Sequence, residues 1–236
     1  MSGYYTPEEA QDVFLKANEA YAREDYAAAQ EGYEKLLSRG HGGPDVLYNL
    51  GTTQLAKGDL GRAVLALEQA KKQGGRAPDL EANLAVARAR QVDKVVGATA
   101  EEEFLPRVTA ATDGAAVAWT FLASWVGALL LLLAWRWMRP GKRTVVGLLA
   151  AFLFVVALPS GVLLAAHAYV EHTVHEAVVL SPTLVARELP QPGARSIFEV
   201  HAGLKVRLLE ETGKFVRIRL PNGLEGWTER DGVSEI

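Results

Sequence analysis

The residues best suited to chemistry lie in one short stretch, His172-Thr-Val-His175-Glu176. On a helix the two histidines would share a face. The stretch matches neither the HExxH nor the HxxEH zinc pattern, however, and the sequence offers no evident third ligand. The chain has no cysteine, which excludes a disulfide framework, a thiolate nucleophile and a cysteine-ligated zinc site. We therefore expect no metal site and no cofactor.

Other patterns that would indicate catalysis or nucleic-acid binding are also missing. The glycine-rich stretches at 40–43 and 74–75 lack the Lys-Ser/Thr of a phosphate-binding loop, and the sequence has no Gly-x-Ser-x-Gly elbow. The formal net charge is −3, from 25 basic and 28 acidic residues, so no global positive field attracts nucleic acid. We expect a protein that is not an enzyme, with no catalytic residue and no nucleic-acid partner.

Two long uncharged runs set the architecture. The first covers residues 114–135 and the second covers residues 144–170. As a helix, the first run would be about 33 Å long, enough to cross the hydrocarbon core of a bilayer. The runs therefore predict two transmembrane helices, at 114–138 and 144–170.

The connection between these runs contains Arg136, Arg139, Lys142 and Arg143. Short basic loops stay in the cytoplasm, which predicts a two-pass membrane protein with both soluble ends on the opposite side of the membrane. Export of the amino-terminal region requires a signal peptide, and the first residues do not resemble one, so we expect that a signal peptide once preceded Gly3. The alternative places both ends in the cytoplasm.

An internal repeat appears when the amino-terminal region is aligned with itself at an offset of 34 residues. The matching pairs include Ala17 with Gly51, Tyr26 with Leu60, and Ala29 with Ala63. This period and its alternation of small and large residues resemble the tetratricopeptide repeat. The resemblance implies two repeats and a capping helix within residues 1–95, and such repeats bind partners on the concave face of their first helices.

That face supplies the candidate partner-binding residues. They are Asn18, Tyr21, Tyr48, Asn49, Thr52, Leu55 and Asn83. The repeats that clamp a peptide carboxylate have basic residues at the positions held here by Phe14, Asp79 and Asn83, so we do not expect carboxylate capture. An alternative role for Asn49 and Asn83 is a structural hydrogen bond within the repeat.

After Ala177 the apolar residues alternate with polar ones, as in half-buried strands. The short strands and turns, and above all Gly226-Trp227, resemble a bacterial SH3-like barrel. Arginines alternate with the apolar residues of these strands. They indicate either an anionic ligand or an ordinary exposed face with charges of both signs.

The order of these parts resembles the BatE family of aerotolerance operon proteins. The resemblance implies a non-enzymatic scaffold of the bacterial inner membrane, with both termini in the periplasm. It would act in an envelope stress or assembly complex associated with a MoxR-type ATPase. Its partners would be von Willebrand A-domain membrane proteins and other proteins of the same operon. The expected fold is a multi-domain membrane protein with all-α tetratricopeptide-repeat hairpins, two transmembrane helices and a C-terminal all-β SH3-like barrel. The expected regions are the repeats at 1–95, a juxtamembrane linker at 96–113, the first helix at 114–138, a cytoplasmic turn at 139–143, the second helix at 144–170 and the barrel at 171–236.

Two other functions remain open. In the first, the barrel recognises peptidoglycan and the repeats recruit a wall enzyme. In the second, the chain is a small subunit of an enzyme, which the residue inventory disfavours.

Overall fold

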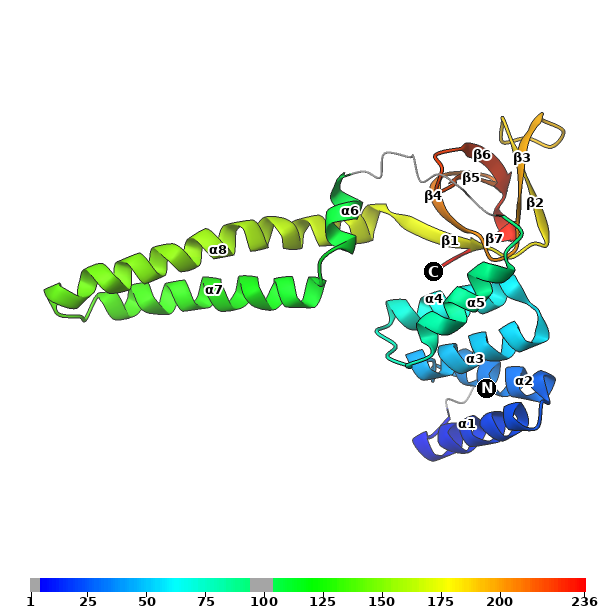
Figure 1. Cartoon of the computed structure of the whole chain (residues 1–236), viewed down its shortest axis with the longest axis horizontal. Coiled ribbons are helices and arrows are strands. Elements are labelled where there is room, and N and C mark those ends of the chain that lie inside the picture. Colours follow the sequence, from blue (N-terminus) through cyan, green and yellow to red (C-terminus); the bar gives the residue numbers. More distant parts are fainter. Residues whose placement is uncertain (1–4, 94–103) are drawn as a thin grey trace. The chain divides into compact units, whose positions relative to one another are not determined.

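A computed structural model of the chain describes residues 5–93 and 104–236 (Figure 1). The chain divides into two compact units. One unit joins Met1–Ala100 with His175–Ile236, and the other is Glu101–Val174. The segments on either side of the expected transmembrane region therefore fold together.

The amino-terminal part of the first unit consists of helices that stack side by side in chain order (Figure 1). They are α1 (Pro7–Ala22), α2 (Tyr26–Ser38), α3 (Pro44–Lys57), α4 (Leu60–Lys72) and α5 (Leu80–Arg90). The side chains of Asp25 and Asp59 accept hydrogen bonds from backbone N–H groups in the first turns of α2 and α4, at 3.1 and 3.3 Å. Gly58 ends α3 in the left-handed conformation, with a φ of 83°. The expected pairs of helices are thus confirmed.

Small residues let the paired helices approach closely. Ala17, Ala29 and Ala63 are buried. A Cβ on Gly51 would lie 2.7 Å from Leu67 Cγ and 3.1 Å from the Ala63 carbonyl oxygen, so only hydrogen fits at this crossing. The 34-residue spacing of small residues therefore marks the points at which these helices touch.

The carboxy-terminal part of the first unit is an antiparallel sheet in the order β3-β2-β6-β5-β4-β1-β7. Its strands are β1 (His175–Val179), β2 (Thr183–Arg187), β3 (Ser196–His201), β4 (Lys205–Thr212), β5 (Phe215–Arg219), β6 (Glu225–Glu229) and β7 (Val233–Glu235). The expected barrel is wrong in one respect, because the sheet does not close. The three residues of β7 pair with β1, and β3 pairs with β2. Strand β3 lies at the edge of the sheet. The backbone N–H of His201 donates to Asp93 Oδ2 at 2.6 Å instead of to a further strand.

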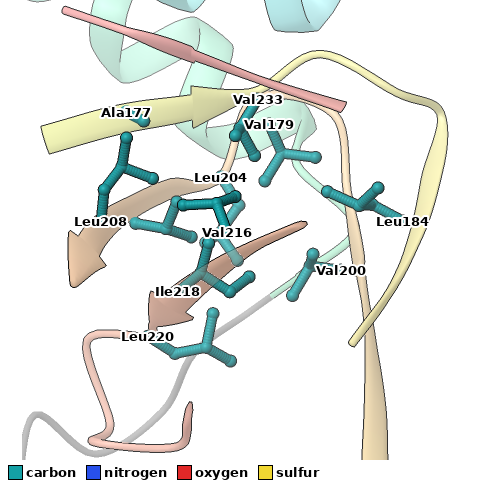
Figure 2. Packing of buried hydrophobic residues seen from close by; sticks show 11 residues of the cluster. Ala177, Val179, Leu184, Val200, Leu204, Leu208, Val216, Ile218, Leu220 and Val233 are labelled. Atoms are coloured by element: carbon teal, nitrogen blue, oxygen red, sulfur yellow. The ribbon is translucent and has the colours of Figure 1, made fainter. Parts of the chain in front are cut away.

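One face of this sheet forms an apolar core (Figure 2). Val179, Val200, Val216 and Ile218 have almost no exposed surface, and Leu204 and Val233 close the cluster. The alternation in the sequence correctly predicted the buried side chains of β4 and β5, among them Val206, Val216 and Ile218, since successive residues of a strand point to opposite faces.

The opposite side of β1 packs on the helices. Val178 is completely buried in a cluster with Leu55, Ala63, Val64 and Ala87. A Cβ on Gly61 would lie 2.9 Å from Leu180 Cα and from the Val179 carbonyl oxygen. The helices and the sheet therefore share a second apolar core.

The second unit contains α6 (Phe104–Ala110), α7 (Gly114–Trp135) and α8 (Pro140–Thr173). Helices α7 and α8 are long and apolar enough to cross a membrane, with mean hydropathy of 2.1 and 2.5 in their most apolar stretches. Helix α7 ends at Trp135 and not at residue 138, and α8 begins at Pro140 and not at residue 144. The break between the helices therefore lies at residues 136–139, and not at 139–143 as expected. Helix α8 continues through Pro159, and Gly161 lets the Phe121 ring approach closely.

Candidate partner-binding groove

A recess of about 280 Å³ lies on the face expected to bind partners. It is lined by Asn18 and Tyr21 of α1, Tyr33 of α2, and Asn49 and Thr52 of α3. We call this recess the groove. Its five lining residues are all uncharged, and they combine aromatic surface with side-chain amides and hydroxyls.

Asn18 is the centre of the hydrogen bonding in the groove. Its Oδ1 accepts from the Tyr33 hydroxyl at 2.7 Å and from Asn49 Nδ2 at 3.1 Å. These bonds join α1, α2 and α3 through one atom. Because a buried hydroxyl needs a partner, they also fix the orientation of the Asn18 amide.

A second set of bonds continues from α3 to α5. Asn83 Nδ2 donates to Thr52 Oγ1 at 3.0 Å and lies 3.5 Å from the Tyr48 hydroxyl. The Thr52 hydroxyl in turn donates to the Tyr48 carbonyl oxygen at 2.9 Å. Asn49 and Asn83 thus make hydrogen bonds between neighbouring repeats and not within one repeat, and Asn49 in addition lines the groove.

Tyr21 and Tyr33 of the groove hold their hydroxyl protons more tightly than an exposed tyrosine. Burial, with a smaller effect of nearby Tyr21, raises the pKa of Tyr33 to about 12. The pKa of Tyr21 is raised above its ordinary value for the same principal reason, with added effects of Tyr26 and Tyr48. At neutral pH both hydroxyls are therefore hydrogen-bond donors without charge.

The structure gathers Asn18, Tyr21, Asn49 and Thr52 around the groove, and Asn83 bonds to its edge. Leu55 differs from the expectation. It is 6% exposed and packs against Val178 of the sheet, so its side chain offers no surface to a partner. Tyr48 is half-buried and packs against the apolar cluster between α3 and α5.

Tyr33 was not among the expected groove residues, because it lies in the second helix of its repeat and the binding face was expected on the first helices. A signal for this residue was present. Tyr33 aligns with Leu67 in the next repeat, and a buried position that gains a hydroxyl requires a hydrogen-bond partner nearby. Asn18 is that partner.

The stretch around His172 and His175 does not form one helical face. His172 lies in the last turn of α8, whereas His175 begins β1. Within residues 5–93 and 104–236, no group of three or more histidine or acidic side chains is placed to hold a metal ion.

Comparisons with known proteins do not assign this chain to a family. No protein-family model matches this chain, and no curated protein matches it significantly. The proposed function therefore rests on the geometry of the groove and on the composition of the two units.

Proposed function

We propose that the chain is a non-enzymatic membrane scaffold that binds protein partners through the groove. The single observation that carries this proposal is the groove itself, where three helices bring together ordered amides and hydroxyls beside aromatic rings. An extended peptide needs such donors and acceptors for its backbone and apolar contacts for its side chains. Since the lining is uncharged, recognition would not depend on a terminal carboxylate.

The likeness of the helix pairs to tetratricopeptide repeats agrees with this role. Stacked helix pairs present a continuous concave surface, and their small residues at 34-residue intervals serve packing. On this proposal the protein belongs with BatE-like scaffolds. Its partners are then von Willebrand A-domain membrane proteins that act with a MoxR-type ATPase.

We further propose that α7 and α8 form a two-pass anchor in the bacterial inner membrane. The shared core of the first unit supports this arrangement, because residues before α7 and residues after α8 pack together. Both flanking segments must then lie on the same side of the membrane, so the chain crosses twice or not at all. The apolar surfaces of α7 and α8 favour two crossings. The basic connection between them favours periplasmic ends.

A charge placed beside the groove, on α5, tests partner binding. Val86 is 42% exposed on α5 and lies one turn from Asn83. Val86→Glu in the full chain should abolish cross-linking to partners in native membranes while membrane insertion remains. Leu224→Glu introduces the same charge at an exposed apolar residue between β5 and β6 and is the matched control.

Equal recovery of cross-linked partners with Val86→Glu and with the native chain would contradict the groove proposal. Binding of the native protein to isolated peptidoglycan sacculi that persists in Val86→Glu and is lost on substitution in the sheet would favour the wall-binding alternative.

A further inference from the structure

The connection from α7 to α8 concentrates positive charge without local compensation. Arg136, Arg139, Lys142 and Arg143 fall within eight residues, and no acidic residue occurs between Asp113 and Glu171. The side chains of Arg136, Arg139 and Lys142 are exposed and have no ion-pair or hydrogen-bond partner among the described residues. We call these three residues together with Arg143 the basic turn. Their mutual repulsion is unfavourable unless an anion neutralises it.

Arg143 is held differently from the other three. Its Nε donates to the Met138 carbonyl oxygen at 3.0 Å, and its guanidinium lies over the Trp135 ring at 5.6 Å from the ring centre. These contacts hold one cation in place beside an aromatic surface. Arg136, Arg139 and Lys142 remain available for a ligand.

The length of α8 carries the basic turn beyond the hydrocarbon core. Its 34 residues span about 51 Å, against about 30 Å for that core. Trp137, which is 76% exposed, follows Trp135 at the same end of the hairpin. Tryptophans of this kind are typical of the level of the lipid headgroups.

An apolar stripe continues from the basic turn along α8. Val145, Leu149 and Phe152 follow Lys142 at helical spacing, and all three are exposed. A free phosphate would contact only the cations. A lipid would place its phosphate at the cations and its acyl chains along this stripe.

We propose that the basic turn is a binding site for the phosphate group of an anionic phospholipid. The guanidinium groups of Arg136 and Arg139 suit two oxygens of one phosphodiester, and Lys142 adds a third charge. This inference rests on the proposed two-pass anchor, because only a spanning hairpin brings the turn to headgroup depth.

The test is native mass spectrometry of the full chain in detergent, with dioleoylphosphatidylglycerol and dioleoylphosphatidylcholine as probes. The native chain should retain the anionic lipid in preference to the zwitterionic one. The triple variant Arg136→Gln, Arg139→Gln, Lys142→Gln should lose this preference, by roughly fivefold for each charge removed. The variant Arg136→Lys, Arg139→Lys keeps the charges and should keep most of the preference.

A triple variant in the first unit is the matched control. Arg76→Gln, Arg195→Gln, Lys214→Gln removes the same number of exposed positive charges and should leave the lipid preference unchanged. An equal loss in this control would overturn the proposal, because net charge and not the basic turn would explain the binding. The proposal would also fail if inorganic phosphate alone displaced the anionic lipid completely.

Alkaline carbonate treatment of native membranes separates this proposal from the anchor on which it rests. If carbonate releases the chain, the two-pass anchor fails and the lipid site fails with it. If the chain resists carbonate and shows no preference for the anionic lipid, the lipid site alone is wrong.

Discussion

The Asn18 amide organises the groove at the scale of single residues. It accepts from Tyr33 and from Asn49, so the positions of three helices depend on one oxygen atom. A binding surface ordered before the partner arrives loses less conformational entropy on binding. The same bonds thus serve the fold and the proposed function.

Tyr33 should make the stability of the first unit sensitive to alkaline pH. Its folded-state pKa of about 12 lies above the ordinary value of 10, so the folded state holds its proton more tightly than the unfolded state. This contribution to the free energy of unfolding is fully present below pH 10 and is lost as the pH rises towards 12. The loss is on the order of 2 kcal/mol.

Urea unfolding of the detergent-solubilised chain, followed by circular dichroism between pH 9 and 12, measures this loss. In Tyr33→Phe the decline should be smaller, and stability at neutral pH should fall by about 1 kcal/mol through the lost bond to Asn18. Tyr26→Phe removes a hydroxyl from the same helix as a control. An identical pH profile for Tyr33→Phe and the native chain would refute the assignment.

Leu55 and Tyr33 show where sequence reasoning on single residues stops. Leu55 aligns with Tyr21 by the repeat, yet Val178, far away in the sequence, buries it. A periodic pattern reports contacts within its own repeat and carries no information on a distant strand. The sequence correctly predicted that Asn18, Asn49 and Thr52 lie together, because the residues around them belong to adjacent repeats.

At the scale of elements, glycine and alanine set the distance between helices. Gly51→Leu should force α3 and α4 apart, because a Cβ at Gly51 already meets Leu67 and the Ala63 carbonyl. We expect a loss of roughly 1 to 3 kcal/mol in the free energy of unfolding. Hydrogen exchange of the full chain should rise in α3 and α4. Ala56→Leu, at an exposed position of α3, should leave exchange unchanged.

Contact between α4 and the sheet gives a second prediction at this scale. Gly61→Leu would push a side chain against the backbone of Val179 and Leu180, so the helices and sheet should separate. Hydrogen exchange should then increase in β1 and β7 as well as in α4. Arg62→Leu puts the same side chain at the adjacent exposed position. Protection of β1 that survives Gly61→Leu would contradict the shared core.

The helices and strands themselves were largely predictable from the sequence, whereas the failure of the sheet to close into a barrel was not. Asp25, Asp59 and Gly58 begin and end helices through local bonds, so their residue types are sufficient signals. Alternation also identified the buried face of β5 through Val216 and Ile218. Which strands become edges depends on distant partners, such as Asp93 at the end of β3.

At the scale of the molecule, two segments separated by the apolar hairpin form one unit. Among the described residues, a side-chain hydrogen bond and an ion pair join them in addition to the apolar core around Val178. His201 Nδ1 lies 2.8 Å from Asp93 Oδ1, and Lys205 Nζ lies 3.4 Å from buried Glu68. This joined unit is the basis for expecting both segments on one side of a membrane.

Site-specific thiol labelling tests that expectation most directly, since the chain has no cysteine of its own. Three single variants report the three regions. They are Arg76→Cys between α4 and α5, Lys214→Cys between β4 and β5, and Lys142→Cys in the basic turn. With a membrane-impermeant maleimide on intact spheroplasts, the first two should be labelled, and Lys142→Cys only after permeabilisation. Labelling of Arg76→Cys without Lys214→Cys, or of all three alike, would contradict a two-pass scaffold with its soluble segments folded together.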